Sequence, residues 1–284
     1  MYNNSKEIVI NTFDSASQKF DEIGTPFFKH YGRILADFAE IKPDDNVLDI
    51  ACGKGSAIFP ISDKLSGEGK IYGIDISSNM IAECKKLMNH TNKNVHFLVM
   101  DAENLEFEDE SFDKVICGFG LFFLPDIEKG LNEIKRVLKP DGLLTFSSWN
   151  KEYQMKWFVD ILIKYNPDIN KNKQVCEEKI KENDFDTIIG LEKMLKIGGF
   201  KKEQIIVENI DCYYNSPEEW IETKWHTAHR MFFEQLSKKD YAGLKDEIID
   251  HLQDFKQDGK IKIEMSAFMT KASKATLNHQ AGRF

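Results

Sequence analysis

Asp49-Ile50-Ala51-Cys52-Gly53-Lys54-Gly55 is the stretch of this sequence that decides the fold. It continues an apolar run, Val47–Ala51, that predicts a buried strand, and it leads into a helix candidate, Ser56–Leu65. A backbone that turns sharply beside a ligand needs residues without bulky side chains, and Ala51, Gly53 and Gly55 meet that need. The stretch therefore predicts a strand, a ligand-cradling loop and a helix in succession.

The same cycle of apolar run, loop and amphipathic stretch recurs along the chain. Further strands are predicted at Lys70–Asp75, Val95–Val99, Lys114–Cys117, Gly142–Ser147, Gln204–Tyr214 and Lys260–Thr270. Helices are predicted at Ser78–Met88, Ile127–Leu138, Tyr153–Tyr165 and Asp186–Ile197, and in most of Pro217–Asp254. This alternation predicts an α/β fold with a Rossmann-like, seven-stranded, mostly parallel sheet, helices on both faces, and a helical flap before the last strand.

The pattern divides the chain into four parts. An N-terminal helical cover (1–40) precedes the Rossmann-like core (41–150), and residues 151–274 complete the sheet and carry the flap (about 215–258). The tail, 275–284, lacks periodicity and is predicted to be disordered.

Composition narrows the class of protein. The 284 residues carry a net charge of −9, and their basic residues are scattered, which argues against a nucleic-acid partner. No apolar run is long enough to span a membrane, and the polar N-terminus does not resemble a signal peptide, so a cytoplasmic protein is expected. The five cysteines lack Cys-x-x-Cys spacing, which favours free buried thiols and predicts no metal site.

Asp75 is a second indication of the kind of ligand that the loop would bind. It ends the second predicted strand, 20 residues after Gly55, where a carboxylate can accept hydrogen bonds from both hydroxyls of a ribose. Dinucleotides and S-adenosylmethionine (SAM) both carry such a ribose. Dinucleotide loops have a third glycine where this chain has Ile58, and Asp49 would repel a pyrophosphate but attract the amino group of SAM. These residues favour SAM.

Several segments resemble the class I SAM-dependent methyltransferases, most closely those of ubiquinone and menaquinone biosynthesis and their secondary-metabolite relatives. Asp49–Gly55 resembles the family's acid-x-Gly-x-Gly-x-Gly loop with Ala51 in place of the first glycine, and Asp75 matches its ribose-binding acid. The other similar segments are Met100–Glu103, Ser111–Ile116, Arg136–Gly142 with Asp141 in place of a glycine, Phe13-Asp14 with Phe20-Asp21, and Ser216–Trp220.

This resemblance implies SAM as cofactor and a set of residues that contact it. The implied cofactor contacts are Asp49, Ala51, Gly53, Gly55, Asp75, Ile76, Met80, Asp101, Ala102, Cys117, Gly118 and Phe20. Phe20 stands where tyrosine is common in the family.

The acceptor side is less defined. Gly118–Asp126, called the aromatic wall below, stands where family members separate the methyl group from its acceptor, although its apolar residues could equally pack a helix. The expected acceptor contacts are Phe119, Phe122, Phe123, Trp149 and Trp225. Candidate bases are His226, His229 and His30; the first two are three residues apart and would share a helix face.

Together these observations predict a SAM-dependent methyltransferase that acts on O, N or C of a small, hydrophobic or aromatic metabolite, as a monomer or homodimer. Two alternatives stay open: a SAM-binding protein without methyl transfer, and an NAD-dependent oxidoreductase or epimerase. The sequence identifies neither the acceptor nor the atom that is methylated.

Overall fold

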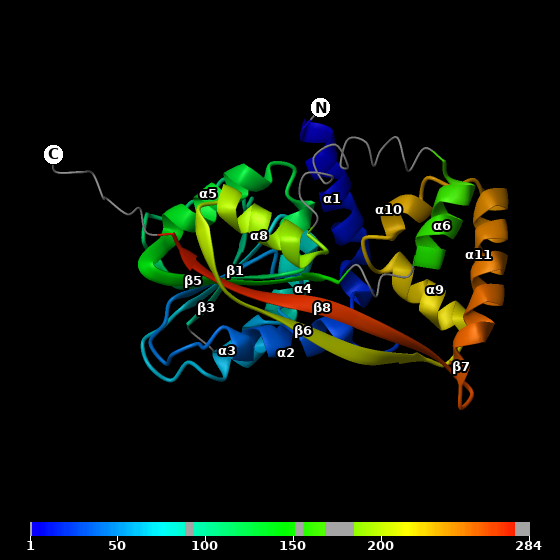
Figure 1. The fold of residues 1–284 in the computed structure, drawn as a ribbon, viewed down its shortest axis with the longest axis horizontal. Coiled ribbons are helices and arrows are strands. Elements are labelled where there is room, and N and C mark those ends of the chain that lie inside the picture. The colour runs from blue at the N-terminus through cyan, green and yellow to red at the C-terminus, as the bar shows by residue number, and fades with distance from the viewer. Residues whose placement is uncertain (1, 89–93, 151–155, 168–184, 276–284) are drawn as a thin grey trace.

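The computed structural model describes residues 2–88, 94–150, 156–167 and 185–275. Within them, an eight-stranded sheet has the order β3-β2-β1-β4-β5-β8-β6, with β7 paired to β8 (Figure 1). The strands are β1 (Val47–Ile50), β2 (Ile71–Asp75), β3 (Val95–Val99), β4 (Phe112–Gly118), β5 (Leu138–Trp149), β6 (Phe200–Tyr214), β7 (Lys256–Gln257) and β8 (Lys260–Lys274).

The parallel part of the sheet positions the site. Strands β3, β2, β1, β4 and β5 pair in parallel, whereas β8 runs antiparallel between β5 and β6. The chain proceeds from β1 to β2 and β3 on one side, then crosses back to β4 and β5 on the other. Ligands bind outside the carboxyl ends of strands at such a switch point. The predicted Rossmann-like sheet is confirmed, and the switch point lies between β1 and β4.

The eighth strand, β7, is a short addition that the sequence did not predict. Lys256 pairs with Ile261 and Gln257 with Lys260, so β7 and β8 form a hairpin. Asp258 and Gly259 both have left-handed backbones, with φ of 49° and 81°. Two residues of this type make the tight turn that matches strand twist. With only two residues, β7 has no alternation that a pattern analysis can detect.

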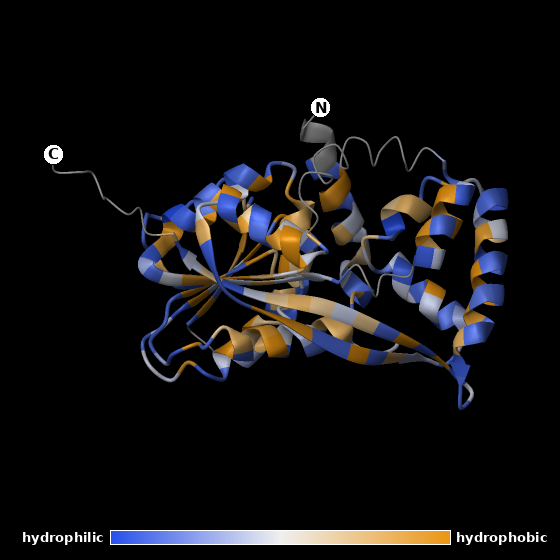
Figure 2. Ribbon diagram, in the orientation of Figure 1, coloured by the Kyte–Doolittle hydropathy of each residue, from blue (hydrophilic) through white to orange (hydrophobic). Residues whose placement is uncertain are grey.

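The helices form two layers and a separate cluster. They are α1 (Tyr2–Ala16), α2 (Phe27–Phe38), α3 (Ile58–Ser62), α4 (Ser78–Leu87), α5 (Ile127–Val137), α6 (Lys156–Tyr165), α8 (Ile188–Ile197), α9 (Pro217–Trp225), α10 (Arg230–Phe233) and α11 (Lys238–Leu252), with 3-10 turns η1 (Ser17–Lys19), η2 (Leu121–Phe123) and η4 (Gln253–Phe255). In Figure 1, α5 and α8 cover one face of the sheet and α2 and α3 the other. Apolar residues are concentrated in the strands and on the helix faces that cover them (Figure 2).

The first core helix is shorter than predicted. The sequence pattern suggested Ser56–Leu65, whereas α3 spans Ile58–Ser62. Proline has no amide hydrogen, so it fits only where the first turn leaves N–H groups unbonded. In a helix that began at Ser56, Pro60 would be the fifth residue and would have to donate an N–H that it lacks. In a helix that begins at Ile58, Pro60 is the third residue, within the first turn, where no N–H is needed.

The predicted flap residues form α9, α10 and α11, and α6 joins them beside the end of the β6 and β8 strands (Figure 1). Helix α9 begins as the sequence suggests, because the Ser216 hydroxyl accepts a hydrogen bond from the Glu219 amide at 3.2 Å and Pro217 follows it. Trp220 is fully buried, with its ring 4.9 Å from Phe158 and 5.6 Å from Trp157 between centroids. The aromatic residues of the flap therefore form a packing face of their own.

Some sequence predictions fall on residues that the structure does not describe. These are Tyr153 to residue 155 of the predicted helix, Cys176, and residues 276–284 of the predicted tail. The four described cysteines, Cys52, Cys84, Cys117 and Cys212, are free and buried, as expected. In the part of the chain that the structure describes, no helix has both the length and the apolar character needed to cross a membrane.

Candidate cofactor and acceptor site

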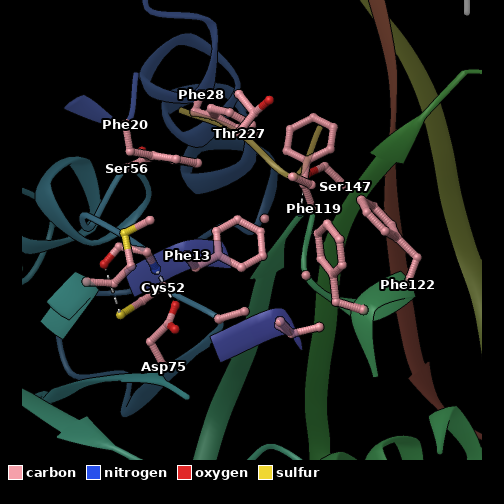
Figure 3. Close-up of a pocket in the computed structure, with 18 of the residues that line it drawn as sticks. Phe13, Phe20, Phe28, Cys52, Ser56, Asp75, Phe119, Phe122, Ser147 and Thr227 are labelled. Atoms are coloured by element: carbon pink, nitrogen blue, oxygen red, sulfur yellow. Dashed lines mark hydrogen bonds between the residues drawn. The ribbon is translucent and has the colours of Figure 1, made fainter. Parts of the chain in front are cut away.

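A cavity of about 350 Å³ opens at the carboxyl ends of the parallel strands. Its wall combines the ends of β1, β2, β4 and β5 with residues of the N-terminal cover and of the flap. In Figure 3, Asp75 and Cys52 lie at one end, Phe119, Phe122 and Ser147 lie at another, and the Phe13 ring is between them. The switch point of the sheet is thus a cavity shared by three parts of the chain.

The loop after β1 has the backbone that its small residues permit. Ala51, Gly53 and Gly55 have φ of 54°, 52° and 84°, all in the left-handed region. Gly53 lines the cavity, and its amide donates to Oδ2 of Asp75 at 2.9 Å. Ala51 adopts the strained conformation at an energetic cost of about 1–2 kcal/mol, which a glycine would avoid. Strain of this kind is typical of functional sites.

Gly55 is required for packing and does not line the cavity. A Cβ at this position would lie 2.9 Å from Sγ of Cys84 and 3.1 Å from the Phe59 ring. Ile58 stands where a dinucleotide-binding loop would have its third glycine, and Gly73 of β2 provides the space for its side chain. Ile58 is fully buried, and a Cβ on Gly73 would lie only 2.4 Å from its Cδ1. Helix α3 approaches the sheet closely because β2 carries a glycine under Ile58.

Two buried carboxylates face the cavity from β1 and β2. Asp75 accepts hydrogen bonds from the amides of Gly53 and Ser77, at 2.9 and 2.8 Å, and burial raises its pKa to about 6. Asp49 is 2% exposed, and no hydrogen-bond donor of the described residues reaches its carboxylate. Burial, and then the neighbouring Asp75, raise the pKa of Asp49 well above its ordinary value. A ligand with ribose hydroxyls and a positive charge would satisfy both carboxylates.

Asp101 follows β3 and lines the cavity next to Ala102. Its Oδ1 accepts from the Glu103 amide at 2.9 Å, and its Oδ2 accepts from Nζ of Lys6 at 2.6 Å. Lys6 also pairs with Glu103 at 2.6 Å. These contacts attach helix α1 to the segment that follows β3, where Asp101 and Ala102 line the cavity.

Two more polar contacts hold the N-terminal cover over the cavity. Asp14 accepts from the Ser77 hydroxyl at 2.5 Å and from the Asn79 amide at 3.0 Å, at the start of α4. Lys54 is 5% exposed; its amino group donates to the Gln18 carbonyl at 3.2 Å and pairs with Glu22. These contacts attach the N-terminal cover to the start of α4 and to the loop after β1, on either side of the cavity.

The aromatic wall lines the cavity in the structure. Phe119 stacks on Trp149 with 4.1 Å between ring centroids, and Phe28 of α2 adds an edge contact to Phe119 at 5.7 Å. Phe119 has a left-handed backbone, φ 57°, and its amide donates to the Ser147 hydroxyl at 3.1 Å. Leu121 instead packs in the core, which is the alternative that the sequence left open. Some residues of the aromatic wall therefore line the cavity, as Phe119 does, whereas others pack in the core, as Leu121 does.

The flap contributes a turn to the cavity, and one sequence prediction is wrong here. Helix α9 ends at Trp225, so His226 and His229 lie in the turn before α10 and do not share a helix face. The Thr227 hydroxyl donates back to the Lys224 carbonyl at 3.2 Å. His226 turns away and contacts Glu222 at 3.1 Å, whereas His229 lines the cavity.

The protonation of His229 follows from its contacts. Its Nδ1 lies 3.0 Å from the Thr227 hydroxyl, whose single hydrogen is directed to the Lys224 carbonyl. We assign the neutral tautomer with its proton on Nδ1, donating to the hydroxyl oxygen, because this arrangement satisfies both contacts of Thr227; Nε2 is then the hydrogen-bond acceptor. Burial, with the nearby Lys224 charge, lowers the pKa of His229 to about 3, so the ring stays neutral.

Most of the sequence-predicted residues meet at this cavity. It is lined by Asp49, Ala51, Gly53, Asp75, Ile76, Met80, Asp101, Ala102, Gly118 and Phe20 from the cofactor set, by Phe119, Phe122, Phe123 and Trp149 from the acceptor set, and by His229. Five predicted residues do not line it: Gly55, Cys117, Trp225, His226 and His30.

Physical reasons account for the five exceptions. Cys117 is fully buried under Gly120, whose added Cβ would meet its sulfur at 2.7 Å. Trp225 packs on Phe233 with its Nε1 donating to the Tyr241 hydroxyl at 2.6 Å. His30 is on the exposed side of α2. Gly55 packs against Cys84 and Phe59, and His226 contacts Glu222, as described above.

Some lining residues were missed by the sequence analysis, namely Lys6, Lys54, Phe28, Thr227 and Lys224. Lys224 carried a detectable signal, because it is a lysine four residues after Trp220 on the apolar face of the flap helix. Lys54 belongs to the loop itself, where the sequence does not indicate which side chains face the cavity, whereas Lys6, Phe28 and Thr227 come from segments whose approach to the loop only the fold reveals. The described residues contain no group of three or more His, Cys, Asp or Glu side chains suited to hold a metal ion.

Comparison with known proteins places this geometry in a family. One family profile matches residues 1–201, from α1 to the start of β6. The chain belongs to the ubiE/COQ5 methyltransferase family. The ubiE/COQ5 assignment confirms the resemblance seen in the sequence, and SAM is the cofactor that it implies. The orphan carboxylate of Asp49, the Asp75 carboxylate and the open cradle at Gly53 fit that cofactor.

Curated relatives agree with this placement, and a solved structure shares the fold. The chain is 37% identical over 144 residues to the aklanonic acid methyltransferase DauC of Streptomyces sp. strain C5, covering 50% of this chain and 66% of that protein. It is 36% identical over 146 residues to a demethylmenaquinone methyltransferase of Staphylococcus haemolyticus, covering 50% and 61%. The matches thus span less than two thirds of each relative's length. A candidate methyltransferase of Bacillus halodurans C-125 shares the fold, with a TM-score of 0.59, 19% identity, and coverage of 86% and 99%.

Proposed function

We propose that this chain transfers the methyl group of SAM to O, N or C of a small, hydrophobic or aromatic acceptor. The observation that carries the proposal is the continuity of one cavity from the carboxylates of β1 and β2 to the aromatic wall and flap. A methyl transfer needs cofactor and acceptor in one enclosure, because the reaction is an in-line displacement. Alignment of two reactants contributes about 7–11 kcal/mol to lowering such a barrier.

Each part of the cavity has a separate task in this proposal. Bound SAM would supply a methyl group activated by a positively charged sulfur. Asp49 would attract the amino group of SAM, Asp75 would accept hydrogen bonds from the ribose hydroxyls, and Asp101 with the Ala102 amide would hold the adenine. The aromatic wall and the N-terminal cover exclude water from the acceptor, and the wall's apolar surface favours a flat or greasy molecule.

The acceptor end would orient rather than deprotonate its ligand. His229 offers Nε2 as a hydrogen-bond acceptor, and a pKa of about 3 makes it a weak base at neutral pH. The names of the two relatives, which specify aklanonic acid and demethylmenaquinone, support a small-molecule acceptor. Participation in small-molecule biosynthesis belongs to this proposal, and the cytoplasmic location and a monomeric or homodimeric state stay predictions from the sequence.

The test is a measurement of S-adenosylhomocysteine (SAH) release when the protein is incubated with SAM and fractions of a metabolite extract. We expect release that depends on an apolar fraction, with the methylated product identified by its mass. A protein that binds SAM in calorimetry but releases no SAH with any fraction would contradict methyl transfer and favour the SAM-binding alternative. Binding of NAD in place of SAM would favour the oxidoreductase or epimerase.

A further inference from the structure

Lys224 is a buried cation at the acceptor end of the cavity. It lies in α9, is 2% exposed and lines the cavity beside Thr227 and His229. Its amino group lies 4.4 Å from the centroid of the Trp220 ring. None of these residues is among the predicted cofactor contacts.

Three lysines line the cavity, and Lys224 differs from the other two in its partners. Lys6 is paired with Asp101 and Glu103, and Lys54 is paired with Glu22. Within the described part of the chain, Lys224 has no ion pair and no hydrogen bond from its amino group, and the Trp220 ring is its only cation-π contact. A buried ammonium group without a counter-ion is strongly unfavourable, so a ligand that supplies the counter-ion would bind tightly.

The charges of the cavity are also separated. Its three carboxylates, Asp49, Asp75 and Asp101, stand at the ends of β1, β2 and β3, on the cofactor side. Lys224 comes from the flap, across the aromatic wall, where no aspartate or glutamate lines the cavity among the described residues. An acid in the ligand would be repelled from the first end and attracted to the second.

Resting on the proposed methyl transfer, we infer that Lys224 binds the ionised oxygen of an acidic acceptor, namely a phenol, an enol or a carboxylic acid. The neutral His229 next to it accepts a hydrogen bond from a further hydroxyl of the same ligand. An acceptor that is held in its ionised form needs no proton removed, which is consistent with the weakly basic His229. Burial lowers the pKa of Lys224 to about 8, so most of its molecules stay charged at neutral pH.

The experiment compares an acid and a neutral molecule of similar shape, 2-naphthoate and 2-naphthalenemethanol, titrated calorimetrically into the SAH-bound protein. We expect wild type to bind the acid at least about tenfold more tightly than the alcohol, as a charge-assisted contact predicts. Lys224→Met and Lys224→Gln should lose that preference, and Lys224→Arg should keep most of it. Lys238→Met, at an exposed lysine on α11, is the matched control.

Two further readouts separate the possible failures. SAH affinity of each variant should stay within about threefold of wild type, since Lys224 contacts none of the three cavity carboxylates. If wild type does not bind SAH, the proposed function fails. If wild type binds SAH but does not prefer the acid, or if both neutral variants keep the preference, the inference about Lys224 is overturned and the methyltransferase proposal stands. Melting temperatures confirm that the variants compared are folded.

Discussion

The amide nitrogen of Gly53 lies 2.9 Å from Oδ2 of Asp75, so the end of β2 holds the loop that leaves β1. The second oxygen of the same carboxylate accepts from the Ser77 amide at 2.8 Å. A carboxylate can accept about four hydrogen bonds, which leaves it capacity for the two hydroxyls of a ribose. Asp75 thus shapes the cradle and contacts the ligand in it.

The first prediction concerns Asp75→Ala. Loss of two charge-assisted hydrogen bonds, together with a loosened Gly53, should weaken SAM binding by about 100-fold or more. Isothermal calorimetry measures this directly, and Asp63→Ala, at an exposed aspartate after α3, is the control that should bind normally. Unchanged affinity in Asp75→Ala would exclude this cavity as the cofactor site.

The second prediction concerns the pH dependence of SAM binding. Burial raises the pKa of Asp75 to about 6, with Asp14 raising it further and the amides of Ser77 and Gly53 lowering it. The ionised carboxylate accepts hydrogen bonds and attracts a cation, so affinity should be level above pH 7 and fall by about tenfold per unit well below pH 6. Asp75→Asn should flatten this dependence between pH 5 and 7, and a level wild-type profile over the same range would contradict the assignment.

The third prediction concerns the attachment of the N-terminal cover. Asp14→Ala removes the acceptor for the Ser77 hydroxyl and the Asn79 amide, a contact of the helix-capping type worth about 1 kcal/mol. Cleavage by a protease in the first 20 residues should become faster, and SAM affinity should fall about fivefold. Glu7→Ala, on an exposed position of the same helix, should change neither. Equal cleavage rates for Asp14→Ala and wild type would show that this contact does not hold the cover.

The Rossmann-like core could be predicted because each strand of the parallel sheet is recognisable in the sequence as an apolar run followed by small or acidic residues. Asp49, Asp75 and Asp101 end successive strands, and a parallel sheet brings such ends to one edge. Topology therefore brings these three acids together, and the family resemblance implied the remaining cofactor contacts. Of all the predicted contacts with the cofactor, only Gly55 and Cys117 do not line the cavity, because adjacency in the sequence does not tell which residue of a loop faces it and which packs below it.

The acceptor half could not be predicted in the same way. Most of its residues come from a flap that the sequence predicted to be largely helical from Pro217 to Asp254, with no position given for a break. Helix α9 ends at Trp225, and the Thr227 hydroxyl donates to the Lys224 carbonyl in the turn that follows, a contact that leaves no periodic signal. The position of Lys224, four residues after Trp220, suggests that it shares the apolar face of α9, but its burial follows only from the packing of α6 and β6 against that helix.

The fourth prediction concerns the stability that Lys224 costs the fold. Burial lowers its pKa from the ordinary value of 10.5 to about 8, so keeping it charged at neutral pH destabilises the protein by about 3 kcal/mol. Between pH 8 and 10.5 the unfolded chain holds a proton that the folded chain has released, so wild-type stability gains with pH relative to a variant without this group. Cys212 and His229 are the titratable groups that interact with it.

Lys224→Met should therefore unfold at a higher urea concentration than wild type at pH 7, and the difference should shrink as the pH rises towards 10.5. The comparison is made by urea unfolding of both proteins at each pH, with Lys238→Met as the surface control. A Lys224→Met protein that is less stable than wild type at pH 7 would indicate that the lysine stabilises the flap through the Trp220 ring instead.

The fifth prediction separates the two histidines of the flap. His229 presents Nε2 at the cavity, whereas the Nε2 of His226 contacts Glu222 at 3.1 Å outside it. His229→Ala should lower kcat/KM for the acceptor by about 10-fold or more, with loss of an oriented hydrogen bond, and leave SAM affinity nearly unchanged. His226→Ala should stay within about threefold of wild type, because its contact with the partly exposed Glu222 lies outside the cavity and contributes little. A larger loss in His226→Ala than in His229→Ala would mean that the turn after Trp225 rearranges when the acceptor binds, and would move the orienting role from His229 to His226.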